Sequence, residues 1–586
     1  HEAAERPEGP GQHVDGGGVV RVVLGPEGAA LFERAAELYA EAGDPGEALA
    51  AHARAAYVRA LAGDVDTAVT AVAALYDRVL TLYAEDATGI RQTASVLMGR
   101  ARILMRRVYE AEEPTGNDPA PGADDPVLVE AEAAVREVLA LVDGHTGGDV
   151  RLASRAAEAR AMLAELALRS GDPHTAAALF TRAAGEYVTA GLPWFAVEYE
   201  ARLAGIAHQL GDAAEAERAL RAALEHGGAQ LEPVGRAQLH LQLAEVVGGR
   251  GQAEEAAEHA LEAAHWADEA GESRTLGAWA RHLLGGFLLR QGRWAEAAEV
   301  LESALPDLTA ETHGDGAVVQ TQWWLGDCLS ELGEHQAAAE RRLQAAEIAR
   351  HWPEQHDHAT LAHLAAESLG QAGMRAEADR AYARAGELWR ALGNVHGLVR
   401  SLRARAWLAL RAGDGSDGSD GSDGENRADG ENRADGAHGS DRARQLMTDA
   451  LRECAAALAA APDEEARQRL AAELGHTHRQ FGDLLARSCA EDAEDGSIQA
   501  AFEAALAQMT EAVAVFAALG DDALHSRTGA ELAAGWLEAD LGRPAEAAAR
   551  ARAVLSAYAG EDDEAARARR AEAEQMLRVV GEQEDR

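Results

Sequence analysis

Four histidines in the segment HWPEQHDHATLAH form the densest group of candidate metal ligands in the chain. His356, His358 and His363 could supply three imidazoles to a metal ion, with His351 close by. Their spacing matches no zinc motif, and no cysteine lies near them. We expect His356 and His358 in a loop and His363 one turn inside the next helix, as histidines that titrate freely rather than ligands.

The sequence contains no motif of a known catalytic centre. A phosphate-binding loop of the GxxxxGK[ST] form needs a lysine, and the chain has none. HExxH, CxxC and the nucleophile elbow are also absent. Cys328, Cys454 and Cys489 lie too far apart for a disulfide framework, and Cys328 is expected to be a small core residue. We therefore predict no catalytic residue, no metal, no cofactor and no enzymatic activity.

The elements that position these residues follow from a repeat. Six glycines, spaced 40 or 41 residues apart, are each followed by alanine at five and at twelve residues. Each glycine follows an apolar-periodic run, which predicts a helix end in the left-handed region before a second helix starts. Alanines seven apart share one helical face and let two helices approach closely. The glycines are Gly171, Gly211, Gly251, Gly292, Gly333 and Gly373.

Each unit is therefore predicted to be a helix–turn–helix hairpin, and hairpins bury their apolar faces by stacking into a solenoid. The glycine and alanine offsets, with helix pairs such as Leu284-Gly285 and Leu325-Gly326, resemble the tetratricopeptide repeat. Periods near 40 residues also occur in HEAT and armadillo repeats, and the usual tetratricopeptide period is 34. The resemblance implies an all-α, right-handed solenoid or superhelix of roughly twelve hairpins. Versions with long helices resemble the arms of large bacterial signalling and regulatory proteins.

Extension of this register divides the chain into segments. Degenerate repeats are expected over 66–170. In the six clear repeats, the position nine residues after the glycine is apolar except at Arg342. The predicted segments are a disordered lead-in (1–27), a solenoid (28–412, with clear repeats over 171–412), an acidic linker (413–441), further repeats (442–560), and a C-terminal capping helix and tail (561–586).

The linker carries nine acidic and two basic residues and no aromatic or β-branched residue, which predicts disorder. Its closely spaced Asp and Gly residues are similar to calcium-binding loops, but the periodic apolar residue of the known nonapeptide repeats is absent. We interpret it as a flexible spacer. It contributes −7 to the net charge of −44, so −37 is spread along the predicted solenoid and the chain's ends.

The charge excludes some partners and favours others. With 99 acidic residues against 55 basic ones, the chain repels phosphate backbones, so direct nucleic-acid binding is not expected. There is no uninterrupted apolar stretch of about 18 residues, so no membrane partner is expected, and we place the protein in the cytoplasm. The lysine-free, alanine-rich composition suggests a high-GC bacterial gene. The partner is expected to be a protein or peptide with a basic surface.

The resemblance also implies a groove. In the tetratricopeptide family, helix positions 13, 10, 6 and 3 residues before the repeat glycine face the concave side. Glu165, His208 and Glu245 occupy such positions early in the chain, and Trp266 and Trp389 are expected in packing between repeats. If the register slips by one residue, the groove tryptophans become core residues. The predicted partner-binding residues are Trp279, His282, Trp323, Asp327, His363 and Glu367.

These observations favour a non-catalytic scaffold or sensor arm that binds a protein or peptide in its concave groove. The alternative is a regulatory arm of a larger bacterial signalling ATPase or transcription regulator, suggested by a first residue, His1, that is not methionine. An enzyme is disfavoured, because no separate domain remains once the hairpins are assigned.

Overall fold

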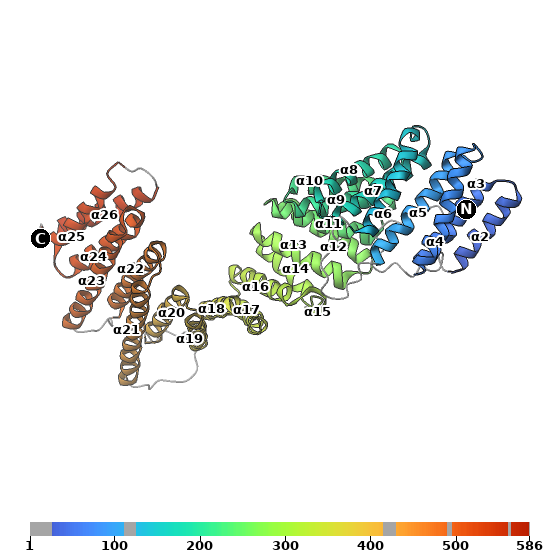
Figure 1. Ribbon diagram of the computed structural model, residues 1–586. Coiled ribbons are helices and arrows are strands. Elements are labelled where there is room, and N and C mark those ends of the chain that lie inside the picture. The colour runs from blue at the N-terminus through green and yellow to red at the C-terminus, as the bar shows by residue number, and fades with distance from the viewer. Residues whose placement is uncertain (1–25, 111–124, 414–428, 489–494, 561–563, 585–586) are drawn as a thin grey trace. The chain divides into compact units, whose positions relative to one another are not determined.

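The computed structural model describes residues 26–110, 125–413, 429–488, 495–560 and 564–584, and these contain helices and no strand (Figure 1). The predicted all-α fold is confirmed for these residues. The helices form two compact units, His1–Gly292 and Arg293–Arg586. In each unit a helix contacts its neighbours in sequence, as in a solenoid of stacked hairpins.

The described part of the N-terminal unit contains twelve α-helices. Consecutive helices pack in pairs, and alternate helices such as α3 and α5 or α5 and α7 also contact one another. The helices are α2 (Pro26–Glu41), α3 (Pro45–Leu61), α4 (Val65–Ala84), α5 (Ile90–Glu110), α6 (Pro126–Val142), α7 (Val150–Arg169), α8 (Pro173–Thr189), α9 (Val197–Gln209), α10 (Ala213–Gly227), α11 (Pro233–Gly249), α12 (Ala253–Glu269) and α13 (Ala278–Arg290). Short 3₁₀ or π turns precede several of them, including η3 (Pro193–Phe195) and the π turn η5 (Ser273–Gly277).

The C-terminal unit repeats the same pattern, with longer helices toward its end. Its helices are α14 (Trp294–Ala304), α15 (Ala310–His313), α16 (Asp315–Glu331), α17 (His335–Ala349), α18 (His356–Gln371), α19 (Arg375–Ala391), α20 (Val395–Gly413), α21 (Asp429–Ala459), α22 (Glu464–Arg487), α23 (Asp495–Ala518), α24 (Leu524–Asp540), α25 (Pro544–Ala557) and α26 (Glu564–Glu584).

The repeat glycines end their helices as predicted. All six have φ between 72° and 82°, in the left-handed region that favours glycine. At Gly171, the glycine N–H donates to Leu168 O at 3.0 Å and the next N–H, of Asp172, donates to Ala167 O at 2.8 Å. The Asp172 carboxylate then accepts from Thr175 N at 3.0 Å and caps α8. One Gly-Asp pair therefore ends one helix and starts the next.

The repeat alanines form the seam between paired helices. All twelve alanines at the two predicted offsets are 0% exposed. The position nine residues after the glycine is also buried in every repeat, even where it is Arg342, at 5% exposed. The expected packing role of Trp389 and the core position of Cys328 are confirmed by their burial, whereas Trp266 is half-buried. The alanines are Ala176, Ala183, Ala216, Ala223, Ala256, Ala263, Ala297, Ala304, Ala338, Ala345, Ala378 and Ala385.

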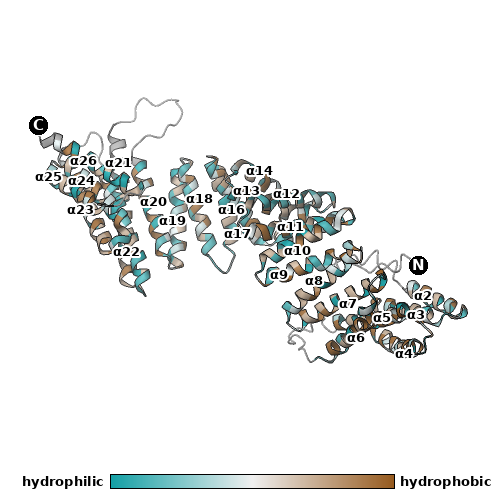
Figure 2. Cartoon of the chain, turned by 90° about the horizontal axis from the view of Figure 1, so that it is seen from above, coloured by the Kyte–Doolittle hydropathy of each residue, from teal (hydrophilic) through white to brown (hydrophobic). Residues whose placement is uncertain are grey.

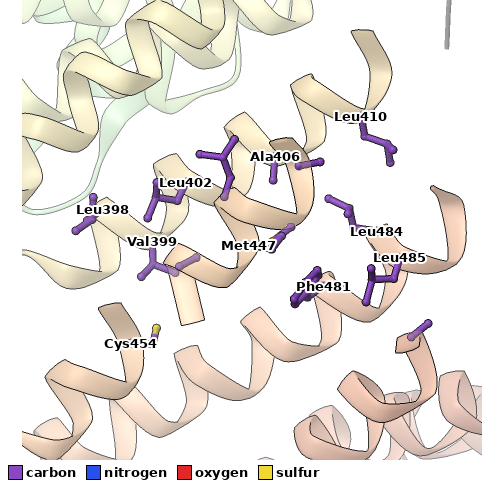
Figure 3. Packing of buried hydrophobic residues seen from close by; sticks show 14 of the residues in the cluster. Leu398, Val399, Leu402, Ala406, Leu410, Met447, Cys454, Phe481, Leu484 and Leu485 are labelled. Carbon is purple, nitrogen blue, oxygen red and sulfur yellow. The ribbon is translucent and has the colours of Figure 1, made fainter. Parts of the chain in front are cut away.

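Each helix carries both hydrophobic and hydrophilic residues, as Figure 2 shows. In the C-terminal unit the apolar faces of α20, α21 and α22 meet in one cluster (Figure 3). Leu402 and Ala406 of α20 lie near Met447 of α21, with Phe481 and Leu484 of α22 on the other side. The core therefore runs through successive helices, which is how a solenoid replaces a single central core.

The predicted disordered linker differs from the structure at its C-terminal end. Helix α21 begins at Asp429, so residues 429–441 are helical, while 414–428 lie outside the described residues. The reason is that α21 already has a strong amphipathic nucleus further along, and extending an existing helix costs far less than starting one. Residues 1–25 of the predicted lead-in and Cys489 also lie outside the described residues.

One described helix segment, Gly496–Ala518 in α23, is long and apolar enough to cross a membrane by length and composition. Within the unit, α23 packs against α22 and α24. Its buried stripe includes Ala505, Met509 and Phe516, all at most 1% exposed. A third of the apolar segment is buried within the described residues.

Candidate functional site

The N-terminal unit encloses a cavity of about 660 Å³, a size typical of ligand pockets. Alternate helices α3, α5, α7 and α9 supply most of its wall, with Phe32 of α2 and residues around η3 completing it. Every lining residue belongs to this one unit. The cavity is therefore the candidate ligand site of the chain.

The residues that line the cavity lie on one face of each helix. The lining residues of α5 recur every three or four positions from Ser95 to Tyr109, and those of α7 do so from Val150 to Glu165. Residues at this spacing share a helical face. Gly99 lets α5 approach α3 closely, because a Cβ at this position would lie 3.2 Å from the Ala53 Cβ.

Arginine dominates the charged residues of the cavity wall. Six arginines and two glutamates, drawn from four helices, line it. This local excess of positive charge occurs in a chain whose net charge is −44. A guanidinium presents a planar fork of donors that matches the geometry of carboxylates and phosphates. The arginines are Arg54, Arg102, Arg106, Arg151, Arg155 and Arg202.

The two glutamates orient two of these arginines. Arg102 donates from Nε and Nη2 to the two carboxylate oxygens of Glu158, each at 2.7 Å. Arg202 donates from Nη1 to Glu165 Oε1 at 2.9 Å, and the Tyr109 hydroxyl donates to the other oxygen of Glu165. Bidentate and shared contacts of this kind fix a guanidinium plane. Arg102 and Arg202 are therefore held in fixed orientations in the cavity wall.

A third acid, Glu198, lies one turn before Arg202 on α9, with Oε1 3.2 Å from the Arg202 Nε. Burial raises the pKa of Glu198 to about 8; Arg202 lowers it and Glu165 raises it further. Burial also raises the pKa of Glu165, against the opposing effect of Arg202. Burial and the neighbouring Glu165 thus favour the protonated form of Glu198, which weakens its compensation of the Arg202 charge.

Aromatic and flexible apolar side chains make up the rest of the wall. Tyr199 stacks on the buried ring of Tyr187 with centroids 5.7 Å apart, and Phe195 packs on the same ring at 5.6 Å. Unbranched thioether side chains adapt their shape to an irregular ligand. Three of them line the cavity: Met98, Met105 and Met162. The wall thus combines apolar area with a few positioned polar groups, as ligand pockets do.

The predicted groove residues belong to two different units. In the N-terminal unit, Trp279 is half-buried and its Nε1 donates to Glu245 Oε1 at 3.3 Å. Its ring stacks on His282 with centroids 4.9 Å apart. His282 is only 4% exposed, which differs from the predicted exposed face. Helix α13, which carries His282, packs against α11 and α12.

In the C-terminal unit, Trp323 packs beside a buried cluster that includes Val319 and Leu361. Asp327 accepts a hydrogen bond from Nη2 of the buried Arg342 at 2.7 Å. Burial raises the pKa of Asp327, while Arg342 lowers it. The carboxylate of Asp327 is thus committed to a buried cation of its own chain.

The other two predicted residues lie on α18. His363 is 5% exposed, and its Nδ1 lies 3.0 Å from Ser401 Oγ. Burial lowers the pKa of His363 to about 4, with a further contribution from Arg400. Glu367 is partly exposed, 3.4 Å from Nη2 of Arg400. The placement of His363 on an exposed face is therefore wrong, because α18 turns it toward α20.

The histidine group also differs from its prediction. Helix α18 begins at His356, so His356 and His358 are helical and not in a loop. His358 is 8% exposed, and burial lowers its pKa, as do Arg384 and Arg350. It therefore does not titrate freely. The helix starts early because Asp357 in its first turn complements the positive end of the helix dipole. Among the described residues, no three His, Cys, Asp or Glu side chains are grouped to hold a metal.

Sequence reasoning found part of the cavity and missed most of it. Glu165, expected on the inner face, does line it. The four arginines of α5 and α7 were missed, because the glycine register does not extend clearly into residues 66–170. Arg54 and Arg202 lie outside that stretch and were missed as well. The signal was present in the spacing of Arg102, Arg106 and Tyr109, which recur at four and three residues on α5.

No family model and no curated protein matches the sequence. Among solved structures, the chain is similar to YrrB, a TPR protein with an unusual peptide-binding site (16% identity, 33% of this chain, 87% of that chain, TM-score 0.27). It is similar to the TPR-like repeats of a Podosopora anserina putative kinesin light chain (22%, 33%, 94%, 0.28). It is also similar to a Pyrococcus horikoshii signal transduction ATPase with a tetratricopeptide repeat sensor (12%, 75%, 56%, 0.31).

The class of the protein follows from its own hairpins. Paired helices joined at left-handed glycines and packed through alanines at fixed offsets recur along the described residues. These features define an all-α helical-repeat protein of the tetratricopeptide-like kind.

Proposed function

We propose that this protein is a non-catalytic interaction scaffold or sensor arm, and that the cavity of the N-terminal unit binds a segment of a protein or peptide partner. The observation that carries the proposal is the cavity itself. Stripes from four alternate helices converge on about 660 Å³ and combine aromatic, methionine and arginine side chains. Aromatic and arginine residues are the side chains that most often dominate the energy of protein interfaces.

The arrangement suits an extended segment. Alternate helices of a stacked solenoid repeat the same face at regular steps, so successive side chains of an extended ligand meet equivalent positions on successive hairpins. YrrB, one of the similar structures, is described as having a peptide-binding site. We include as finer parts of the proposal a cytoplasmic location and an acidic outer surface that attracts a partner with a basic surface.

A selection experiment tests this function. A phage library of random 12-residue peptides is panned on the full chain, and enriched peptides are measured by fluorescence anisotropy. The variant Ser95→Trp places an indole in the cavity wall, whereas the control Thr181→Trp places one on an exposed position of α8 outside it. We expect Ser95→Trp alone to abolish binding. Enriched peptides that bind both folded variants equally would exclude the cavity as the site.

The alternative role, a regulatory arm within a larger signalling ATPase or transcription regulator, uses the same cavity as its sensor. One similar structure is described as a signal transduction ATPase with a tetratricopeptide repeat sensor. Reading the genomic sequence upstream of the codon for His1 tests it. A start codon there with no further coding sequence would contradict this alternative.

A further inference from the structure

We propose that the cavity selects an acidic ligand: an extended peptide segment in which carboxylate side chains alternate with apolar ones. This inference rests on the proposed peptide-binding function and adds the chemistry of the partner. It differs from the expectation drawn from total charge, which favours a basic partner. The cavity and the outer surface can select ligands of opposite charge, because salt limits the electrostatic field of each to its own neighbourhood.

The first support is the charge of the wall. Six guanidinium groups line the cavity and only two carboxylates do. Glu158 and Glu165 are engaged by Arg102 and Arg202, so they are poorly available to a cationic ligand. A lysine or arginine side chain entering here would face a surplus of like charge in a partly desolvated site. A ligand carboxylate would instead be attracted by this surplus of positive charge.

The second support is the distribution of the arginines. Arg54, Arg102 and Arg155 lie on three successive lining helices, α3, α5 and α7. Arg102 lies over the ring of Tyr57, another lining residue, at 5.6 Å. Positive charge is thus spread across the cavity rather than gathered at one point. Such a spread fits several carboxylates along a chain better than one compact anion.

The third support is the apolar wall between the charges. Met98, Met105 and Met162 lie among the arginines, and Phe195 borders the cavity at η3. Burying apolar side chains of a ligand against this wall supplies affinity, while the guanidinium groups supply charge selection. A purely polar anion would leave this apolar wall exposed to water. An acidic segment with interspersed apolar residues covers both.

The net charge of −44 does not oppose this assignment. At physiological ionic strength the screening length is about 8 Å, so acidic groups elsewhere on the solenoid are largely screened from a ligand inside the cavity. The raised pKa of Glu198 also favours its neutral form, which reduces the negative charge near Arg202. The local excess of arginine therefore sets the sign of the potential that a bound ligand meets.

The test compares the composition of selected peptides on matched proteins. The random 12-residue library is panned on the full chain and on the double variant Arg106→Gln/Arg155→Gln, which removes two positive charges from the wall. Arg102 and Arg202 are left unchanged, because their loss would deprive Glu158 and Glu165, which line the cavity, of these partners. Arg106 pairs with Glu110 at 3.4 Å, but the Glu110 side chain is 39% exposed and does not line the cavity. The control Arg182→Gln/Arg218→Gln removes the same charge from side chains that are 62% and 67% exposed outside the cavity.

Peptides selected on the wild type are expected to be rich in Asp and Glu with apolar residues between them. Their affinity should fall by about tenfold or more in Arg106→Gln/Arg155→Gln and stay within about twofold in the control. A Glu→Lys version of the best peptide should bind more weakly than the parent. Thermal melts of both double variants verify that they are folded.

Two results would overturn the inference in distinguishable ways. Enrichment of basic or uncharged peptides that Ser95→Trp blocks would refute acidic selection while leaving peptide binding in place. Failure to enrich any peptide that Ser95→Trp blocks would refute both acidic selection and the proposed function.

Discussion

Arg342 and Asp327 provide a quantitative test of how this solenoid accommodates a charge in its core. Arg342 occupies the buried position that is Leu220 or Leu301 in other repeats. Its side chain is 7% exposed and that of Asp327 is 34% exposed. Nη1 of Arg342 also donates to Leu364 O at 3.3 Å and to Ser368 Oγ. The two partners of this ion pair therefore differ sharply in their access to water.

This difference predicts an asymmetric mutant cycle. Asp327→Ala leaves a buried guanidinium without its carboxylate and should cost about 3 kcal/mol, the lower end for breaking a buried pair. Arg342→Leu restores the apolar residue of neighbouring repeats and leaves a carboxylate that water can reach, so it should cost about 1 kcal/mol or less. The double variant Asp327→Ala/Arg342→Leu should lie within about 1 kcal/mol of wild type, because no buried charge remains.

The assay is native-state hydrogen exchange of the amides in α16, α17 and α18, which reports local free energies in a solenoid that need not unfold in one step. Urea unfolding of the same four proteins gives an independent ranking. If Arg342→Leu costs as much as Asp327→Ala, or if the two losses simply add in the double variant, the pair is not a buried cation held by a partly exposed acid. A strong loss of partner binding in folded Asp327→Asn would instead support the predicted role of Asp327 in the partner-binding groove.

Three further predictions concern single residues. Burial raises the pKa of Glu198 to about 8 from an ordinary value of 4.5, so the cost of this carboxyl group to stability grows as pH rises between these values. The melting temperature of Glu198→Gln relative to wild type should therefore increase from pH 5 to pH 8 and then level off. A difference that stays constant with pH would contradict the burial of this acid. Burial lowers the pKa of His363 to about 4 from 6.5, so wild type should lose stability as pH falls from about 6.5 to about 4, and His363→Gln should lose less. Equal acid sensitivity of the two proteins in melting experiments would refute the burial of a neutral imidazole. Gly211 has φ 79°, so Gly211→Ala should destabilise the protein by about 1–2 kcal/mol. Gly185 is exposed inside α8 with nothing within 4 Å of an added Cβ, so Gly185→Ala should stabilise it by about 0.5–1 kcal/mol. Equal effects in urea titrations would show that the turn does not require glycine.

The fold could be predicted from the sequence because it depends on local, repeated signals. Glycine at a left-handed turn and alanine at a close helix contact each follow from one residue and its offset, as at Gly171, Ala176 and Ala183. The start of α21 at Asp429 could not be predicted in this way, because a helix can extend into a sequence that would not form one alone.

The site was harder to predict because exposure depends on which neighbour covers a helical face. His282 and His363 share the offset of Trp323 before their repeat glycines, yet both imidazoles are buried. Spacing assigns a residue to one side of its helix, but exposure also depends on how far the adjoining helix extends over that side. Much of the cavity wall lies where the repeats are least regular, so the spacing of its arginines could not be assigned to a face by counting from a repeat glycine.

The central claim is that ligand binding belongs to the cavity of the N-terminal unit and not to residues 279–367. Photo-cross-linking measures this most directly: a peptide enriched on the full chain is synthesised with p-benzoylphenylalanine at an apolar position, irradiated in complex, and the attached residues are mapped by mass spectrometry. We expect cross-links on the lining faces of α3, α5, α7 and α9, including Met98 or Met162. Cross-links concentrated on α13, α16 and α18 would contradict the claim.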